Sequence, residues 1–352
     1  MAEFDAALVR QALESTRDEV HAEFERLLAE RRRTGYGRMC DLMASYLLRP
    51  GSKFLRPALL RAAFQAAGGT GTGYLVTATS LEMFHKAALV IDDCNDRSQT
   101  RWGRPTIYGE HGADVAVVTG FGMTAAVLEL LIANLQEVGV RKTLEVQTEF
   151  GRMAAETAEG QLRDILWIHE EVLQVQEEDY MQVASRKTGT YTAASALYMG
   201  VLLGASPGAA APTAAQLLVV REFGQLVGIA FQACDDILNA LAPQDAYEKP
   251  KDDLYEPKPT PHLYHFLRTA QGATLERALR FLRAPRPAKA PAEADWLLEA
   301  MRDHGSLAYA QEFADACARR ALAVERDLGF LEENEGRRFL REAILYAVQR
   351  DR

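Results

Sequence analysis

Helical periodicity runs through almost the whole chain, and it limits the possible folds more than any other feature. Between residues 4 and 32, apolar side chains recur at mostly helical intervals among charged ones, namely Phe4, Leu8, Ala12, Val20, Phe24 and Leu27. Similar patterns cover residues 38–48, 55–67, 75–94, 112–138, 144–168, 176–203, 213–241 and much of 260–350. Strand-like alternation is scarce. The sequence therefore predicts an all-α fold.

The breaks between these helical stretches are short. They are clusters of glycine, proline and alanine, such as GGTGTG at 68–73, ASPGAAAPTA at 205–214 and APRPAKAPAEA at 284–294. None is long enough for a convincing domain linker, and no repeat of fixed period is present. With 352 residues, 48% of them hydrophobic, the chain can form one large helical domain with an ample core. We therefore expect a single domain over residues 1–352.

Composition disfavours several classes of protein. The net charge of -9 argues against a nucleic-acid partner, because such proteins carry a basic surface. No apolar run approaches the roughly 20 residues that a membrane span needs, and the charged N-terminal stretch lacks the apolar centre of a signal peptide. The four cysteines have no CxxC spacing, so neither a zinc site nor a disulfide framework is indicated. A reducing, cytoplasmic location is the expectation.

An acidic cluster follows one of the apolar stretches. In IDDCNDRSQTRW, residues 91–102, Asp92 and Asp96 lie one turn apart on a helix, with Asp93 about 100° round from Asp92. Most short acidic runs are solvated helix faces. Here the apolar run AALVI leads directly into the acids, so they lie where a buried helix emerges. Carboxylates in that position need a countercharge, and Mg²⁺ is commonly held by one or two carboxylates together with substrate phosphates.

The same spacing recurs far along the chain. In QACDDILN, residues 232–239, Asp235, Asp236 and Asn239 repeat the i, i+1, i+4 pattern after the apolar run LVGIAF. One such motif is a weak signal, whereas two are much harder to attribute to chance. If two helices present them to the same cavity, the motifs form a metal clamp for a diphosphate.

Further short motifs stand in order around these two. They are GSKFLRP at 51–57, EMFHKAALVIDD at 82–93, GQLRD at 160–164, KTG at 187–189, FQ at 231–232 and KPKDDLYEPKPT at 249–260. Over roughly residues 45–265 the chain resembles the trans-isoprenyl diphosphate synthases, also called the polyprenyl synthetase family. Asp92, Asp93 and Asp96 resemble the first aspartate-rich motif of that family, and Asp235, Asp236 and Asn239 resemble the second.

The resemblance implies a fold and a reaction. The fold is an isoprenoid-synthase helical bundle around a deep central cavity, usually in a homodimer. The enzyme ionises an allylic diphosphate, couples the cation to isopentenyl diphosphate and releases pyrophosphate. Three Mg²⁺ ions held by the two aspartate motifs stabilise the departing oxygens. The cavity is expected to be dry, because water would quench the cation.

The resemblance also implies a role for individual residues. Catalysis is expected of Asp92, Asp93, Asp96, Asp235, Asp236 and Lys187, and metal binding of Asp92, Asp93, Asp96, Asp235, Asp236 and Asn239. Substrate diphosphates are expected to contact Lys53, Arg56, His85, Arg101, Thr188, Gln232, Lys249 and Lys258. Outside this context, lysine and arginine near a helix start are usually surface charges, and a histidine on an apolar face is usually a core residue. Gln161, Asp164 and Gln232 are equally explained as buried polar groups that tie helices together.

Two positions depart from the family pattern. The family normally has two successive arginines after the first aspartate motif, but this chain has Arg101 followed by Trp102. The missing arginine would have served isopentenyl diphosphate. Trp102 is either packed against a neighbouring helix or offers an aromatic face to an acceptor or a cation. Phe121 stands where the family often has aspartate, and no consequence follows from the sequence.

Three functions remain open at this stage. The favoured one is a short-chain isoprenyl diphosphate synthase. The second is a terpene cyclase, or a prenyltransferase with a non-standard acceptor, which Trp102 suggests. The third is a non-catalytic modulatory subunit, which the intact aspartate motifs argue against. Ala87 and Ala88 precede Asp92 by about one helical turn and leave room for a growing prenyl tail. Because the resemblance implies that bulky residues there stop synthesis at C15, we expect C20, geranylgeranyl diphosphate, and otherwise farnesyl diphosphate.

Overall fold

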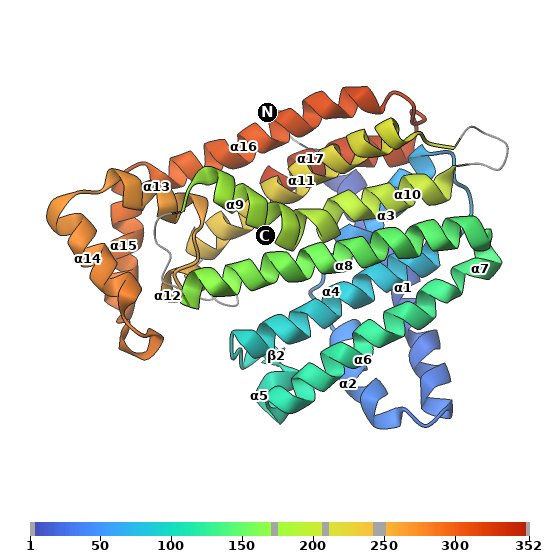
Figure 1. Ribbon diagram of the computed structural model, residues 1–352, viewed down its shortest axis with the longest axis horizontal. Coiled ribbons are helices and arrows are strands. Elements are labelled where there is room, and N and C mark those ends of the chain that lie inside the picture. The colour runs from blue at the N-terminus through green and yellow to red at the C-terminus, as the bar shows by residue number, and fades with distance from the viewer. Residues whose placement is uncertain (1–3, 170–174, 206–210, 242–250, 350–352) are drawn as a thin grey trace.

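The computed structural model describes residues 4–169, 175–205, 211–241 and 251–349, which form an all-α bundle (Figure 1). The prediction of an all-α fold is confirmed. The described residues of the first half form the helices α1 (Ala6–Arg33), α2 (Gly37–Leu47), α3 (Leu55–Ala66), α4 (Leu75–Asn95), α5 (Ile107–His111), α6 (Ala113–Ile132), α7 (Asn134–Glu137) and α8 (Gly139–His169). A short antiparallel hairpin of β1 (Thr100–Arg101) and β2 (Arg104–Pro105) follows α4.

The described residues of the second half are also helical. They form α9 (Glu177–Ala184), the π-helix η1 (Ser185–Ala194), α10 (Ser195–Gly204), α11 (Ala214–Leu241), α12 (Asp252–Tyr255), α13 (Pro261–Thr269), α14 (Gly272–Arg283), the 3₁₀ turn η2 (Arg286–Ala288), α15 (Pro291–Asp303), α16 (Ser306–Glu325), the 3₁₀ turn η3 (Arg326–Leu328) and α17 (Glu335–Gln349). The single helical pattern predicted for 176–203 is thus three successive segments with a π-helix in the middle. π-Helical turns are rare and occur frequently at functional sites.

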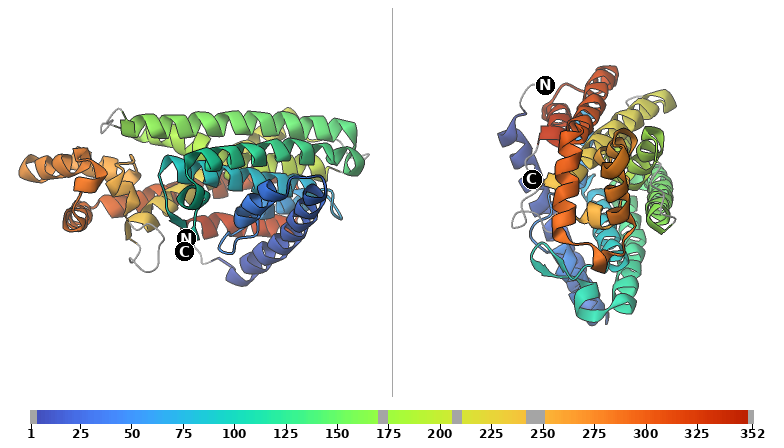
Figure 2. Two further views of the ribbon diagram at one scale, coloured as in Figure 1. Left: turned by 90° about the horizontal axis from the view of Figure 1, so that it is seen from below. Right: turned by 90° about the vertical axis from the view of Figure 1, so that its left-hand side faces the viewer.

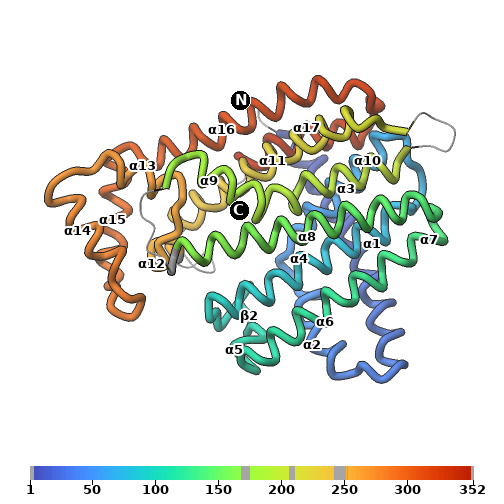
Figure 3. Tube along the Cα trace, viewed as in Figure 1, coloured from blue at the N-terminus to red at the C-terminus, as the bar shows by residue number. Residues whose placement is uncertain are grey.

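The main hydrophobic core lies between the long helices. α4 packs on α6, α10 packs on α3, and α11 packs on α16. Figure 3 shows α8, α10 and α11 running next to one another along the bundle. Large side chains fill the interior, among them the fully buried Phe24, Tyr46 and Phe223. The aspartate motifs lie toward the C-terminal ends of α4 and α11, so both belong to rigid, well-packed elements.

A second, smaller core lies beside the first. α13, α14 and α15 extend from one end of the bundle, where Figures 1 and 2 show them in orange. Their apolar side chains, including Phe266, Leu297 and Met301, bury one another together with Ala240 of α11 and Leu254 of α12. The end of α11 therefore reaches into this second core, and the segment that contains α12 connects it to the main bundle.

Two helical stretches are long and apolar enough to cross a membrane by length and composition alone. They are Ala113–Glu137, of which 44% of the most apolar window is buried, and Ala214–Leu241, of which 67% is buried. The second is a core helix of this fold. The first leaves a row of apolar side chains exposed on α6, so the predicted absence of a membrane span stays a prediction.

Candidate active site

A cavity of about 760 Å³ opens between α4, α8, η1 and α11. Its inner walls carry apolar side chains such as Phe84, Ala88 and Phe231. Its acidic and basic side chains and one asparagine belong to six segments of the chain: Arg56, His85, Asp92, Asp164, Lys187, Asp235, Asp236, Asn239, Asp253 and Lys258. An apolar pocket with a few convergent polar groups is the usual form of a small-molecule site.

The two adjacent aspartates of the first motif point in different directions. Asp92 is half-buried on the cavity wall and accepts a hydrogen bond of 3.2 Å from Gln161 Nε2. Asp93 is fully buried away from the cavity. Its carboxylate accepts a hydrogen bond of 2.6 Å from the Tyr46 hydroxyl and two hydrogen bonds of 2.8 Å from the Arg101 guanidinium. Arg101 also lies 3.6 Å from the carboxylate of Asp92. The predicted roles of Asp93 in metal binding and of Arg101 in diphosphate binding stay predictions.

In the second motif, Asp235, Asp236 and Asn239 all line the cavity. Asp236 is also buried, and its carboxylate accepts hydrogen bonds of 2.7 Å from the Tyr180 hydroxyl and 2.7 Å from Gln232 Nε2. Burial and the nearby Asp253 raise the pKa of Asp236 well above its usual range, although the hydrogen bonds oppose that shift. In each motif the second aspartate is bound to a tyrosine, but only in the first motif does that aspartate lie outside the cavity wall.

Asp96 lies one helical turn beyond Asp92, at the end of α4, and it is half-buried. It lies outside the residues that line the cavity. Its charge nevertheless acts on Lys258, whose pKa it helps to raise. The first motif thus spans the rim of the cavity from Asp92 to Asp96.

Two lysines place positive charge beside the carboxylates at the mouth of the cavity. Lys187 of η1 forms an ion pair with Asp164 of α8. Lys258 lies 3.7 Å from the carboxylate of Asp253. Burial alone would lower the pKa of Lys258, but Asp253 and the other acids outweigh it and raise that pKa well above its usual value. Both lysines line the cavity as predicted, whereas Lys249 lies outside the described residues.

Thr188 and Gln232 connect η1 to the second motif. The Thr188 hydroxyl donates 2.6 Å to Gln232 Oε1, and the amide of Gln232 in turn donates to Asp236. Both residues line the cavity, and their contact with a substrate diphosphate stays a prediction. The chain of hydrogen bonds fixes the orientation of Asp236 and therefore of the helix turn that carries Asp235.

A basic group lies deeper on the wall. Arg56 stacks over the ring of Tyr191 at 4.4 Å and donates 2.9 Å to its hydroxyl. His85 is buried beside it, and burial together with the charges of Arg56, Lys86 and Arg101 lowers the pKa of His85 well below its usual value. Lys53 of the same motif is exposed and lies outside the cavity wall.

The carboxylates suit a metal that also binds its substrate. Within the described residues, no three His, Cys, Asp or Glu side chains are grouped closely enough to hold a metal ion by themselves. Mg²⁺ retains several waters and is typically bound by one or two carboxylates plus phosphate oxygens. Asp92 on α4 and Asp235 on α11, each on the cavity wall, fit that requirement.

Several residues of the site carried no recognisable sequence signal. Tyr46 and Tyr180 fix the buried aspartates, yet each is a lone tyrosine within a helical pattern. Burial and the neighbouring aspartate raise the pKa of each hydroxyl above its ordinary value, so both remain hydrogen-bond donors at neutral pH. Trp102 is half-buried and lies outside the cavity wall, with its ring against Gly51.

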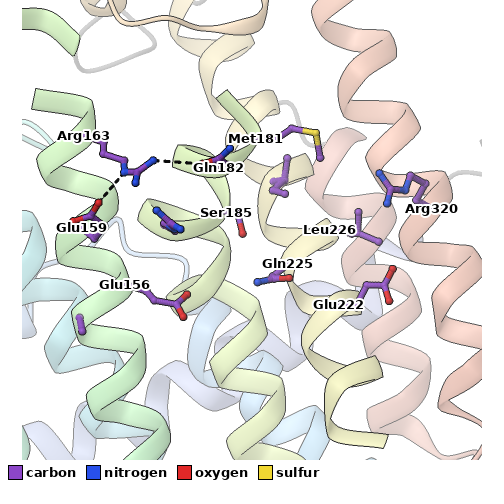
Figure 4. Close-up of a pocket in the computed structure, with 13 residues that line it drawn as sticks. Glu156, Glu159, Arg163, Met181, Gln182, Ser185, Glu222, Gln225, Leu226 and Arg320 are labelled. Atoms are coloured by element: carbon purple, nitrogen blue, oxygen red, sulfur yellow. Dashed lines mark hydrogen bonds and ion pairs between the residues drawn. The ribbon is translucent and has the colours of Figure 1, made fainter. Parts of the chain in front are cut away.

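A second hollow lies on the opposite side of η1. This groove of about 960 Å³ is bordered by α8, η1, α11 and α16 (Figure 4). Its charges are mixed, and Arg163 there binds Glu159 at 2.8 Å and Gln182 at 3.4 Å. None of the predicted site residues lines it. The chemistry implied by the aspartate motifs therefore belongs to the first cavity.

Comparison with known proteins agrees with the fold and the motifs. The chain is 28% identical to the short chain isoprenyl diphosphate synthase of Methanothermobacter thermautotrophicus over 309 residues, which are 88% of this chain and 89% of that protein. It is 29% identical to the octaprenyl diphosphate synthase of Escherichia coli over 315 residues, 89% of this chain and 91% of that protein.

A solved structure shares the fold over nearly the full length. Geranylgeranyl pyrophosphate synthase of Corynebacterium glutamicum, complexed with isoprenyl diphosphate and magnesium, superposes with a TM-score of 0.83 at 23% identity, covering 97% of this chain and 99% of that chain. The sequence profile of the polyprenyl synthetase family matches residues 38–301. The chain therefore belongs to the polyprenyl synthetase family, and it is a prenyltransferase of the isoprenyl diphosphate synthase type.

Proposed function

We propose that this enzyme condenses isopentenyl diphosphate with an allylic diphosphate, with geranylgeranyl diphosphate as main product and farnesyl diphosphate as the second choice. The observation that carries the proposal is the location of Asp92 and Asp235 on the wall of one largely apolar cavity. Such a site anchors a charged diphosphate at its mouth and leaves an apolar space for the prenyl tail.

The residues at the mouth suit the departure of a diphosphate. We assign Mg²⁺, as three ions with the bound diphosphate, to Asp92, Asp96, Asp235 and Asn239, and the relative from Corynebacterium glutamicum was solved with magnesium. When bound, Mg²⁺ supplies Lewis-acid stabilisation of the departing oxygens. Lys187 and Lys258 add positive charge close to the same position.

The remainder of the cavity protects the reaction. Phe84, Ala88, Leu162 and Phe231 present apolar surface to the prenyl tail and leave few polar atoms to bind water. Arg56 and His85 lie on the cavity wall, and Arg56 Nε and His85 Nδ1 have no hydrogen-bond partner among the described residues. We assign this pair to a second anion, the diphosphate of isopentenyl diphosphate. The two diphosphates are then assigned to separate places, one at the acidic mouth with the metal and the other beside Arg56 of α3 and His85 of α4.

The product length depends on the wall formed by α4. Ala88 is on the cavity wall four residues before Asp92, and Ala87 is also in contact with the cavity. Phe84 lies eight residues before Asp92, about 12 Å farther along the helix axis. It packs edge-to-face against Phe150 at 5.6 Å and against Tyr191 at 6.2 Å. We propose that this aromatic group forms the floor, and that the open alanines favour C20. The named relatives range from short-chain to octaprenyl synthases, so the comparisons leave this length open.

One alternative retains a specific observation in its favour. Trp102 replaces the arginine expected after Arg101, which favours a terpene cyclase or a prenyltransferase with another acceptor. Against it, the indole packs on Gly51 and lies outside the cavity wall, so it offers no surface to an acceptor there. The mouth residues Asp92 and Asp235, both on the wall, argue against a non-catalytic subunit.

We propose that the enzyme is a cytoplasmic homodimer. All four cysteines are free thiols, which fits a reducing compartment. A continuous series of exposed apolar side chains covers α6 and continues through α7 into α8, namely Val117, Val118, Phe121, Leu128, Ile132, Leu135, Val140 and Leu144. Exposed apolar surface of this extent is unusual for a monomer and is typical of an interface. The same patch on two copies can pair about a two-fold axis.

One incubation tests the proposed reaction. The purified protein is supplied with Mg²⁺, isopentenyl diphosphate and, separately, dimethylallyl, geranyl or farnesyl diphosphate, and the products are identified before and after phosphatase treatment. A linear C20 alcohol that appears only after phosphatase treatment supports the proposal. A hydrocarbon present before phosphatase treatment would identify a cyclase. Consumption of the allylic substrate only with a different acceptor would support the altered-coupling alternative.

A further inference from the structure

Lys86 is a fully buried lysine next to the proposed anion site, and nothing in the proposed mechanism uses it. It follows His85 on α4 and is 0% exposed. Its ammonium lies 3.6 Å from the carboxylate of Glu82, 4.6 Å from the ring centroid of Trp102 and 5.5 Å from that of Phe54. The Trp102 indole thus packs over the ammonium group of Lys86 rather than over an apolar core side chain.

The polar atoms around Lys86 are poorly satisfied. Lys86 Nζ, Arg56 Nε, His85 Nδ1 and Glu82 Oε2 are buried and have no hydrogen-bond partner among the described residues. Leaving a buried charged donor without an acceptor is costly, and native structures rarely do so without a reason. Three of these four atoms belong to the basic residues of one neighbourhood, so an anionic ligand with several oxygens would satisfy them together.

Like charges surround Lys86. Glu82 lies 3.6 Å from its ammonium, and the Glu82 Oε1 accepts a hydrogen bond of 2.9 Å from Ser52. Arg56 and Arg101 both act on Lys86 as like charges and, after burial, help to lower its pKa to about 8. Arg101 is paired with Asp92 and Asp93, so an anion bound here would chiefly balance the charge of Arg56 and reduce its repulsion with Lys86.

The contacts of Trp102 connect this group to the GSKFLRP loop. A side chain on Gly51 would place its Cβ 3.0 Å from Trp102 Cγ, so glycine permits the indole to lie flat on the loop. Trp102 itself has a φ of 50°, a left-handed conformation that non-glycine residues seldom adopt. The structure therefore maintains some backbone strain that holds the indole over Lys86.

We propose that Lys86 is a further binding residue for the diphosphate of isopentenyl diphosphate, and that it supplies the positive charge that an arginine at position 102 would otherwise bring. The ligand class is a homoallylic diphosphate, bound together with Arg56 and His85. Lysine suits this place because it carries a point charge on a flexible stem that can extend toward the ligand. The inference rests on the proposed function of the same cavity.

A purely structural role makes a different prediction. If Lys86 only neutralises Glu82, its loss lowers stability, and removal of both charges restores it. If Lys86 binds the ligand, removal of both charges restores stability but leaves affinity low. Replacement of Trp102 by arginine then recovers affinity by returning a cation to the site.

The experiment measures binding without turnover. Isothermal titration calorimetry with isopentenyl diphosphate, in the absence of allylic substrate, compares the wild type with Lys86→Met, Lys86→Arg, Glu82→Gln/Lys86→Met and Lys86→Met/Trp102→Arg. We expect Lys86→Met to weaken binding about 10- to 100-fold, as loss of one charge-assisted contact implies. Lys86→Arg and Lys86→Met/Trp102→Arg should stay within a few-fold of the wild type. Glu82→Gln/Lys86→Met should recover the melting temperature of the wild type but not its affinity for isopentenyl diphosphate.

A matched control is Lys142→Met. Lys142 is a half-buried lysine of α8 that donates 2.7 Å to each of the carbonyls of Leu203 and Ala205, far from the cavity wall. Its loss should leave the affinity unchanged. Unaltered binding by Lys86→Met, or full recovery of affinity in Glu82→Gln/Lys86→Met, would overturn the proposal. Absence of any prenyl product from the wild type would instead count against the proposed function, and titration with inorganic pyrophosphate would then still test whether Lys86 binds a diphosphate.

Discussion

In each aspartate motif, the second aspartate is held by a tyrosine. Asp93 and Asp236 accept hydrogen bonds from Tyr46 and Tyr180, and the first aspartate of each motif, Asp92 or Asp235, lines the cavity; Asp236 also lines the cavity. Adjacent residues on a helix are about 100° apart, so one turn can serve both purposes. The buried member sets the rotation of the helix, and the exposed member is then available to a metal.

Loss of either exposed aspartate should abolish most of the activity. We expect Asp92→Ala and Asp235→Ala to lower kcat at least about 100-fold, roughly 3 kcal/mol of transition-state stabilisation, because each removes a metal ligand. Steady-state rates of product formation measure the effect. Asp41→Ala is the control, because Asp41 lies on the surface and contacts Arg32. Full activity in the presence of EDTA would contradict the metal assignment.

The affinity for isopentenyl diphosphate should depend on pH through Lys86. Its pKa is lowered to about 8, first by burial and then by Arg56 and Arg101, while Glu82 opposes the shift and the nearby His21 lies within its field. The charged form binds an anion. As pH rises above 8 the free enzyme loses that charge, so KM for isopentenyl diphosphate should rise, by up to about tenfold per pH unit.

The pH profile of Lys86→Met provides the comparison. Without the lysine, the rise in KM above pH 8 should be absent, and KM should be high throughout. KM for the allylic substrate should be insensitive to the substitution, because that substrate binds near Lys187 and Lys258. A wild-type profile that is flat between pH 7 and 9.5 would show that Lys86 does not titrate in the binding reaction.

At the scale of residues, the spacing of motifs in the sequence identified residues that line the cavity. It did not identify the residues that form hydrogen bonds or ion pairs with them. Asp92, Asp235, Thr188 and Gln232 belong to motifs with fixed intervals and all line the cavity. The pairing of Asp93 with Arg101 escaped prediction, because it depends on how the β1–β2 hairpin folds back on α4. No spacing between residues in the sequence indicates that the hairpin folds back on α4.

At the scale of elements, the π-helix η1 is held by close approaches of two neighbouring helices. A Cβ on Gly160 of α8 would lie 2.4 Å from Lys187 N, and a Cβ on Gly228 of α11 would lie 2.4 Å from Gly189 Cα. Both glycines let backbone meet backbone, which places Lys187 and Thr188 between the two helices. Helical periodicity predicted one continuous helix here, because an inserted residue shifts the pattern too little to be seen in one sequence.

Gly228→Ala should therefore disturb η1 in particular. The added methyl group must push Gly189 away, so we expect a lower melting temperature and a KM for the allylic substrate raised several-fold as Lys187 and Thr188 move. Differential scanning calorimetry and steady-state kinetics measure the two effects. Gly151→Ala on α8 is the control, because no atom lies within 4 Å of the added Cβ. Equal behaviour of the two variants would mean that η1 tolerates the displacement.

The residues of α4 on the cavity wall predict how substitutions there change the length of the product. Ala88→Phe and Ala87→Phe should shorten the main product by at least one isoprene unit, because each fills the path of the tail. Phe84→Ala should lengthen it, because it opens the aromatic floor formed with Phe150 and Tyr191. Chromatography of the dephosphorylated products measures the distribution. Unchanged products in all three variants would mean that the tail does not follow α4.

At the scale of the whole molecule, the exposed apolar face of α6 matters most. Phe121 is 74% exposed and Leu128 is 63% exposed, so the aromatic that replaces an expected aspartate adds to this face. Composition alone cannot reveal it, because the same hydrophobic run serves a core helix, an interface or a membrane span. The structure argues against a fully buried core helix, because one side of α6 remains uncovered, and it leaves an interface or a membrane surface to be distinguished by experiment.

Leu128→Asp and Val118→Asp should convert the proposed homodimer into monomers, since each places a charge within the proposed interface. Size-exclusion chromatography with light scattering measures the mass. The control is Leu218→Asp, because Leu218 is 65% exposed on α11, outside this face. A monomeric wild type contradicts the homodimer, and flotation of the wild type with lipid vesicles would instead assign the face to a membrane surface.

The second core gives the mouth of the cavity a stability of its own. Lys289 donates 2.6 Å to the carbonyl of Tyr255 and thereby fastens α12 to the small core, while Asp253 and Lys258 of the same segment line the cavity. The floor at Phe84 belongs to the main core instead. Regions with separate cores can open locally with different free energies. The proposed entrance and the proposed floor therefore pack against different cores, an arrangement that allows the entrance to open locally while the floor stays packed.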